Sequence, residues 1–170
     1  MRRTLVALAA AALLPAAALA QNPWDVAKKA AGGATTRKLE KEINKRLLDE
    51  ARKNQCSFKS GTAELEKGCD AKSQKLAKSL IDAKKRLNAS GVQNFKFVVS
   101  GHTDSTGSAE KNKALSAHRA AVMVKQLVAK GVPAGDIESV GMGSERPLVS
   151  PDDTPAKKAK NRRYEVQVKL

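Results

Sequence analysis

The chain has 170 residues, with 32 Lys and Arg against 17 Asp and Glu, for a formal net charge of +15. This balance favours a polyanionic partner: nucleic acid, an anionic lipid surface or an acidic wall polymer. The two His residues stand in no metal-ligand spacing, so neither a metal nor a cofactor is expected. Few aromatic side chains are available to stack on bases, which argues against nucleic acid; they are Trp24, Phe58, Phe95, Phe97 and Tyr164.

The first 20 residues have the pattern of a secretory signal peptide. Arg2 and Arg3 form a basic start, residues 5–19 are almost wholly apolar, and Ala18-Leu19-Ala20 places small residues at a cleavage site. At roughly 15 residues the apolar run is shorter than the ~20 that a transmembrane helix needs. We therefore expect export, and a mature chain that starts at Gln21 and has no transmembrane segment. Losing the two arginines leaves 30 basic against 17 acidic residues, a net charge of +13. Export also removes most nucleic acid as a partner.

Cys56 and Cys69 are the two cysteines of the chain, 13 residues apart. In the oxidising compartment that export implies, such a pair most simply forms a disulfide. A zinc or redox pair would require a CxxC spacing or nearby His ligands, and the sequence has neither. The predicted disulfide would constrain the unfolded chain by on the order of 3 kcal/mol.

The first elements after the signal are a lead-in and a helix. Residues 21–34 mix Pro, Gly and Ala, which predicts a flexible linker. Residues 35–54 predict an amphipathic helix, because apolar side chains recur every four positions: Leu39, Ile43, Leu47 and Ala51. The stripe is narrow, so this helix either caps the following domain or docks on a partner.

The main domain is expected over residues 55–170. Its predicted elements are a strand at 56–58, a helix at 70–88, a strand at 95–100, a helix at 108–130, a strand at 137–141, a loop rich in Gly, Pro and Asp up to Lys160, and a strand at 164–168. This order predicts an α/β (α+β) sandwich, with helices packed on one face of a mixed sheet.

A candidate binding site follows the strand at 95–100. Asp104 lies in the polar turn after that strand, where open sheets commonly bind ligands. Asn112 and Arg119 are seven residues apart on the next helix, so they share one face, with Leu115 between them. Asp104 is suited to bind an ammonium group and Arg119 a carboxylate, which together suit a small zwitterion. The alternative is that Asp104 and Arg119 pair with each other.

The same segment resembles a known family. The matching residues are Gly101-His102-Thr103-Asp104, Gly107, Asn112, Leu115-Ser116 and Arg119-Ala120, followed by Gly131-Val132, Ile137, Gly141, Gly143, Pro147 and Asn161-Arg162-Arg163, with Phe58, Ala63 and Leu65 upstream. They are similar to the OmpA-like C-terminal domain, found in OmpA, peptidoglycan-associated lipoprotein and MotB. The resemblance implies a βαβαββ fold that binds peptidoglycan non-covalently, through the diaminopimelate of the stem peptide. It also implies a periplasmic protein, with the outer membrane as a site of association.

The resemblance assigns roles to individual residues of the groove. Asp104 corresponds to the aspartate that binds the ammonium group, and Arg119 to the arginine that binds the carboxylate. The other groove positions implied are Asn112 and Leu115 as lining, Asn161 and Arg163 as a frame from the last loop, and Thr106 and Gly107 as backbone N–H donors. His102 matches as a structural turn residue. Ser100 stands where many members carry an acidic residue, so the charge of the groove differs here.

Two other functions compete with wall binding. The basic surface and the helix at 35–54 favour a periplasmic adaptor that recruits another envelope protein. An enzyme is not expected. Ser116 and His118 are two residues apart on a helix and point in different directions, so they cannot act with Asp104 as a catalytic triad.

Overall fold

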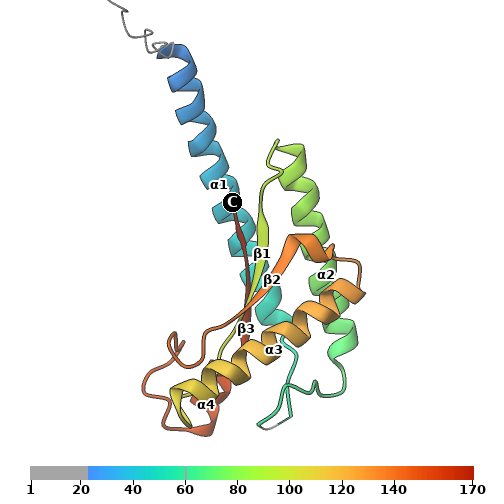
Figure 1. Ribbon diagram of the computed structural model, residues 1–170, viewed down its shortest axis with the longest axis vertical. Helices are drawn as coiled ribbons and strands as arrows, with labels where there is room; N and C mark the ends of the chain where they lie inside the picture. Colours follow the sequence, from blue (N-terminus) through green and yellow to red (C-terminus); the bar gives the residue numbers. More distant parts are fainter. Residues whose placement is uncertain (1–22, 60) are drawn as a thin grey trace, which may run out of the picture. The chain divides into compact units, whose positions relative to one another are not determined.

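The computed structural model describes residues 23–59 and 61–170; the predicted signal peptide and its cleavage site lie outside them. The elements, in chain order, are α1 (Pro23–Lys53), α2 (Cys69–Ala89), β1 (Lys96–Gly101), α3 (Ala109–Ala129), a 3-10 turn (Ala134–Asp136), β2 (Ile137–Gly141), α4 (Pro155–Asn161) and β3 (Tyr164–Lys169) (Figure 1). The chain divides into two compact units, Met1–Ala34 and Thr35–Leu170. All that follows on packing and the site concerns the second unit.

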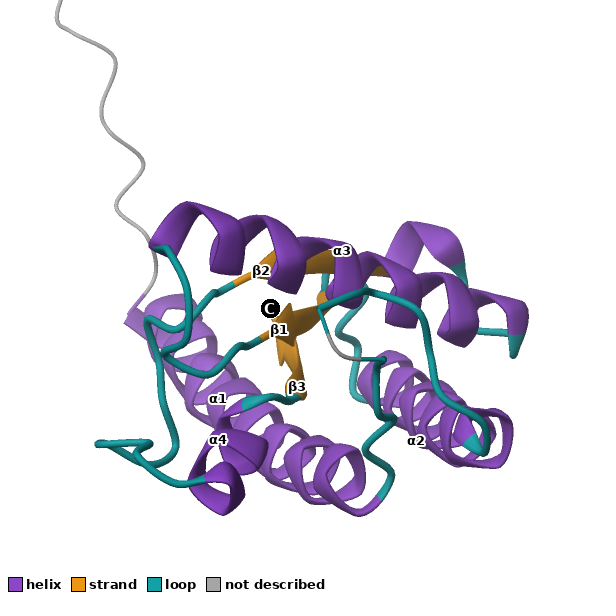
Figure 2. Cartoon of the chain, turned by 90° about the horizontal axis from the view of Figure 1, so that it is seen from below, coloured by secondary structure: helices purple, strands orange, loops and turns teal. Residues whose placement is uncertain are grey.

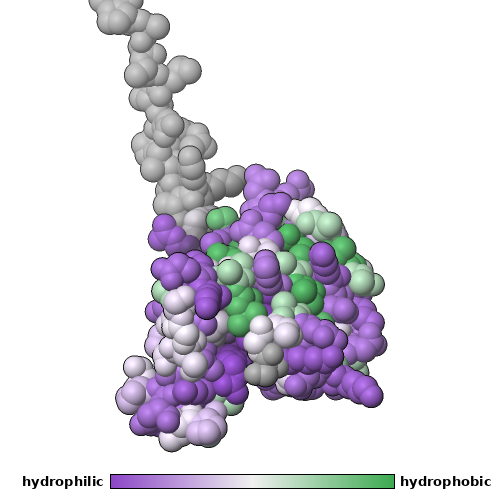
Figure 3. Space-filling model, turned by 60° about the horizontal axis from the view of Figure 1, so that its bottom comes forward, coloured by the Kyte–Doolittle hydropathy of each residue, from purple (hydrophilic) through white to green (hydrophobic). Residues whose placement is uncertain are grey.

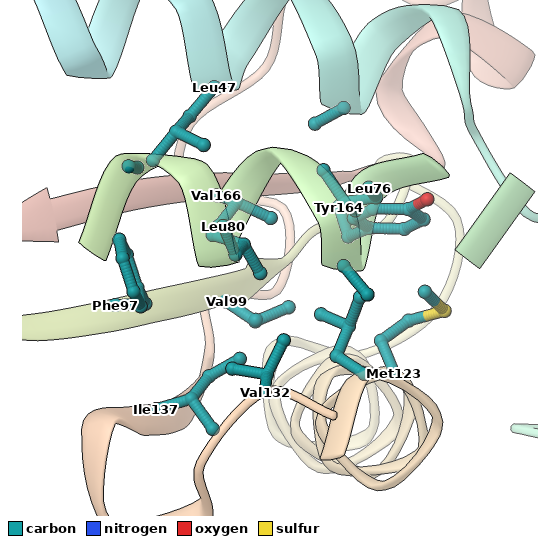
Figure 4. Packing of buried hydrophobic residues seen from close by; sticks show 14 of the residues in the cluster. Leu47, Leu76, Leu80, Phe97, Val99, Met123, Val132, Ile137, Tyr164 and Val166 are labelled. Atoms are coloured by element: carbon teal, nitrogen blue, oxygen red, sulfur yellow. The ribbon is translucent and has the colours of Figure 1, made fainter. Parts of the chain in front are cut away.

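The sheet has the strand order β2-β1-β3, with β1 parallel to β2 and antiparallel to β3. Its two faces differ, as the alternation along β3 shows: Tyr164, Val166 and Val168 are buried, whereas Gln167 and Lys169 are exposed. The buried face meets side chains from α1, α2 and α3 (Figure 4), and Figure 2 shows these helices around the strands. The predicted packing of helices on one face of a mixed sheet is confirmed.

Two glycines let α3 approach the ends of β1 and β2. A Cβ atom on Gly101 would lie 2.2 Å from the carbonyl oxygen of Ser116, and one on Gly141 would lie 2.6 Å from the backbone nitrogen of Ala117. Real Cβ atoms do not come so close, so only glycine permits this contact. The first half of α3 is thereby held directly over the strand ends, next to the turn that carries Asp104.

The helix predicted at 35–54 caps the domain. Ile43, Leu47 and Ala51 of its stripe belong to the hydrophobic core. The Asn44 carboxamide donates to the carbonyl of Val168 (3.0 Å) and accepts from its N–H (2.6 Å), so it serves as a hydrogen-bond partner for edge strand β3. Because the apolar stripe is buried in this way, it is not available for docking on a partner.

Helix α1 starts at Pro23, so the prediction of an irregular linker over residues 21–34 was wrong from that point on. Proline is tolerated in the first turn of a helix, because an N–H group at that position would make no intrahelical hydrogen bond. Glycine inside a helix costs only about 1 kcal/mol relative to alanine. The Gly32-Gly33 pair was therefore not enough to end the helix.

The strand predicted at 56–58 is not part of the sheet. Phe58 pairs only with Leu65, in an isolated antiparallel bridge. Backbone hydrogen bonds from Lys59 N to Glu64 O (2.9 Å) and from Glu66 N to Ser57 O (3.0 Å) close the segment on itself. The βαβαββ order thus lacks its first strand here. Residues 56–59 and 61–69 instead belong to a hairpin-like segment, called the 56–69 loop, which the Cys56–Cys69 disulfide closes as predicted.

A short helix, α4, interrupts the loop predicted up to Lys160. Thr154 caps it by accepting a hydrogen bond from the backbone N–H of Lys157 (3.3 Å), and Pro155 is its first residue. A capping threonine followed by proline is a known helix start. This segment was predicted as a loop because the residues before it are rich in Gly, Pro and Asp.

Candidate functional site

An open groove of about 680 Å³ lies where the turn after β1, the first half of α3, the 56–69 loop and the chain before β3 come together. These segments meet at the lower end of the molecule in Figure 1, and Figure 3, which brings that end forward, shows it as largely hydrophilic. The residues that line it are Gln55, Cys56, Ser57, Phe58, Gly61, Glu66, His102, Thr103, Asp104, Thr106, Asn112, Leu115, Arg119, Lys158, Arg162 and Arg163.

Asp104 is held by hydrogen bonds to both of its carboxylate oxygens. Oδ2 accepts from Nη1 of Arg162 at 2.8 Å, and Oδ1 accepts from the backbone N–H of Thr106 at 3.0 Å. Burial raises the pKa of this carboxyl, but the hydrogen bonds from Arg162 and Thr106 outweigh burial and leave the pKa below its ordinary value of 3.8. Asp104 is therefore ionised at neutral pH.

Arg119 is buried, with 7% of its surface exposed, and it contacts two residues of the 56–69 loop. Its Nε donates to the backbone oxygen of Thr62 at 2.8 Å, and its Cζ lies 5.1 Å from the centre of the Phe58 ring. Burial and the neighbouring Arg162 lower the pKa of Arg119. No carboxylate of the described residues forms an ion pair with it, so the alternative of an Asp104–Arg119 pair is not realised.

Asn112 fixes the turn that carries Asp104. Its Nδ2 donates to the backbone oxygens of Thr106 (3.0 Å) and Asp104 (3.4 Å). Asn112 and Leu115 both line the groove, as does Thr106. The helix face inferred from the seven-residue spacing of Asn112 and Arg119 is thus the face that borders the groove.

Two of the predicted site residues lie outside the groove lining. The buried Asn161 carboxamide binds the backbone of Leu148 and Val149 and does not line the groove. It donates a hydrogen bond to Asp152 at 3.0 Å, and both residues border an adjoining pocket of about 480 Å³. Gly107 has φ of 96°, a left-handed conformation that favours glycine, and shapes the turn. Arg163 lines the groove, and its guanidinium forms an ion pair with Glu165 (2.7 Å).

Several groove residues were not predicted. Arg162 stands inside the quoted Asn161-Arg162-Arg163 motif, yet nothing in the sequence showed that it reaches Asp104. Phe58 matched the family pattern, but its contact with Arg119 depends on the fold of the 56–69 loop. Lys158 was not predicted as a groove residue, because its helix, α4, lies in a segment that was predicted as a loop.

His102 forms part of the turn beneath the groove. Its backbone N–H donates to the oxygen of Arg163 at 2.8 Å. The residue is only 3% exposed, and neither ring nitrogen has a hydrogen-bond partner among the described residues. Burial and the nearby Arg163 lower the pKa of His102 to about 4, so the ring is neutral at pH 7.

The fold and the groove define a class of protein: an α+β binding domain, with opposite charges presented at the end of a central strand. A model of the OmpA family matches residues 57–162, and the chain belongs to that family. Over 73 residues it is 45% identical to the peptidoglycan-binding protein ArfA of Mycobacterium tuberculosis, covering 43% of this chain and 22% of that protein. The chain thus spans well under half the length of that relative.

Solved structures show the same fold. Peptidoglycan-associated lipoprotein from Burkholderia pseudomallei superposes with a TM-score of 0.55 at 23% identity, over 68% of this chain and 89% of that one. The periplasmic domain of Helicobacter pylori MotB gives a TM-score of 0.56 at 22% identity, over 68% and 70%. Within the part of the chain that the structure describes, no helix has the length and apolar character to cross a membrane.

Proposed function

We propose that this chain is an exported, periplasmic protein that binds peptidoglycan non-covalently, by holding the diaminopimelate residue of the stem peptide in the groove. The observation that carries the proposal is that Asp104 and Arg119 line one groove with opposite charges and do not neutralise each other. A zwitterionic ligand needs such a separated pair, because its own two charges must each find a partner.

The groove supplies a distinct contact for each part of the ligand. The Asp104 carboxylate takes the side-chain ammonium, and the Arg119 guanidinium takes the adjacent carboxylate through parallel hydrogen bonds. Leu115, half-buried between them, covers the aliphatic stem of the ligand. Arg119 is already fixed by Thr62 and Phe58, so less side-chain freedom is lost on binding.

Among the described residues, Ser116 and His118 are not placed to act together in nucleophilic catalysis. Ser116 is fully buried; its Oγ donates to the backbone oxygen of Lys113 (2.9 Å) and accepts from the N–H of Gly143 (2.8 Å). His118 is exposed on a different side of α3. Ser116 is thus a structural link between α3 and the loop after β2, which supports binding as the function.

The test is sedimentation of the purified protein with isolated cell-wall sacculi. Asp104→Ala and Arg119→Ala are each expected to abolish binding, since truncating one partner of a desolvated charge pair costs several kcal/mol. Lys113→Ala is the matched control: it removes a positive charge from α3 that pairs with Glu145 at 2.7 Å outside the groove. Thermal unfolding of each variant checks that the fold is retained.

Competition separates specific from nonspecific binding. Free diaminopimelate is expected to displace the wild type at constant ionic strength. Attraction based only on the net charge would instead yield to moderate salt and persist in both groove variants. Binding that persists in both variants but is lost in moderate salt would mean nonspecific attraction by the basic surface, and it would refute the groove as the binding site.

A further inference from the structure

We infer that the Cys56–Cys69 disulfide makes ligand binding redox-dependent, by holding the loop that positions Arg119. The inference rests on the proposed function and adds to it a form of regulation and two positioning elements, the disulfide and Phe58. Three relationships support it: how the loop is closed, what it contacts, and how little of the core it contributes.

Besides the disulfide, the described residues of the 56–69 loop are joined by short-range contacts alone. These are the bridge between Phe58 and Leu65, the backbone hydrogen bonds beside it and the exposed Lys59–Glu64 ion pair (2.6 Å). The residue before the loop is anchored independently, because the Gln55 carboxamide binds the backbone of Tyr164 (2.7 and 3.3 Å). At the other end, Cys69 starts α2. The disulfide ties these two fixed points together, with Cα atoms 5.1 Å apart.

This loop forms one wall of the groove and supports its arginine. Cys56, Phe58 and Glu66 are among the lining residues that it supplies. Thr62, near its tip, accepts the hydrogen bond from Nε of Arg119, and the Phe58 ring lies beneath the guanidinium. A long arginine side chain has many rotamers, so these two contacts select the one in which the guanidinium borders the groove.

The loop contributes little to the core of the domain. The largest fully buried side chains come from α1, α2, α3, the sheet and Val132, whereas the loop adds the two buried cysteines and the partly buried Phe58 and Leu65. Opening the disulfide therefore frees the loop and leaves the domain folded. The opening reaction is exchange with a dithiol, in which two electrons and two protons convert Cys56 and Cys69 to thiols and the dithiol becomes a disulfide.

Binding and reduction are expected to oppose each other. Cys56 lines the groove, so a ligand seated there covers one approach to the disulfide. Linkage requires that, if reduction weakens ligand binding, ligand binding makes the disulfide harder to reduce by the same factor. The equilibrium constant for reduction of Cys56–Cys69 by a dithiol, measured with and without ligand, gives a second and independent readout.

The experiment compares the oxidised protein with the Cys56→Ser/Cys69→Ser variant, using a muropeptide that contains diaminopimelate as the probe in calorimetry. The variant is expected to keep its near-UV circular dichroism and to bind at least about tenfold more weakly. In 15N NMR, the Nε–H of Arg119 should lose its protection from exchange. Phe58→Leu, which leaves the disulfide in place, should weaken binding in the same direction, and Glu64→Ala, on the exposed side of the loop, should not.

Equal affinity of the oxidised protein and the folded double-serine variant would overturn the inference. If the double-serine variant fails to fold, unchanged affinity of Phe58→Leu overturns it instead. Should the oxidised wild type bind no muropeptide, the proposed function fails, and the Nε–H exchange of Arg119, which needs no ligand, still decides whether the disulfide positions this residue.

Discussion

Arg162 donates a hydrogen bond from its Nη1 to Oδ2 of Asp104 at 2.8 Å, so a guanidinium of the protein occupies the carboxylate proposed to bind the ligand ammonium. The two side chains differ in exposure: 45% for Arg162 and 13% for Asp104. On the proposed function, we expect the more exposed Arg162 to give way to the ligand, while Asp104 keeps its contacts with Thr106 and Asn112. The hydrogen bond from Arg162 lowers the pKa of Asp104 and so favours its ionised form.

The pH dependence of wall binding should report this pair. The proposed binding requires ionised Asp104, whose pKa in the folded protein lies below its ordinary value of 3.8. Binding should therefore be retained at neutral pH and lost only at a pH below that ordinary value. In Arg162→Gln the pKa of Asp104 rises, because burial is opposed only by Thr106, and binding is lost at higher pH. Sedimentation with sacculi across the acidic range measures both midpoints. Coincident midpoints would contradict the role given to Arg162.

Gly141 should not tolerate a side chain. In Gly141→Ala the new methyl group meets the backbone of Ala117 and Lys113, both at 2.6 Å, and α3 must shift away from the strand ends. We expect a loss of about 1–3 kcal/mol in the free energy of unfolding, measured in urea. Gly135→Ala is the control, since no atom lies within 4 Å of its Cβ position. A similar loss in both variants would mean that the close approach is not the cause.

Tyr164 is the single tyrosine of the chain, so its ionisation can be followed by absorbance alone. Burial raises its pKa to about 12, and its hydroxyl donates to the backbone oxygen of Asn54 at 2.5 Å. A folded-state pKa above the unfolded value of about 10 means stability that is present below pH 10 and lost as pH rises toward 12. Alkaline titration should show this late midpoint, with unfolding accompanying it.

Tyr164→Phe tests the hydrogen bond itself. The variant leaves the Asn54 carbonyl without its donor, and we expect a loss of about 1–3 kcal/mol at neutral pH. Denaturation of the variant in urea measures it. An unchanged free energy of unfolding would mean that water donates to the Asn54 carbonyl in place of the hydroxyl.

Asn44→Ala should loosen the outer edge of the sheet. The variant removes both hydrogen bonds to the Val168 backbone, at a cost of about 1–3 kcal/mol. Hydrogen exchange of the Val168 amide should become faster, whereas that of the central strand should change only with global stability. Lys41→Ala, an exposed position on the same helix, is expected to leave exchange at Val168 unchanged.

Much of the fold follows from local patterns in the sequence. Alternation in residues 164–168 predicted β3, and Gly131 with Pro133 marked the end of α3, because side-chain period and helix-stop residues act within a few positions. The cysteine pair predicted its disulfide. The family pattern, together with the seven-residue spacing of Asn112 and Arg119, placed Asp104 and Arg119 at one groove.

The partners of these residues were decided only by the tertiary structure. Asp104 pairs with Arg162, 58 residues away, and Arg119 with Thr62, 57 residues away. Charge type and local period carry no information on which of several cations reaches a given carboxylate. The same holds for residues 56–58, where Phe58 pairs with Leu65 of its own loop, which the disulfide closes, and not with a strand of the sheet. Sequence determined which groups the groove has, and long-range packing determined how they are held.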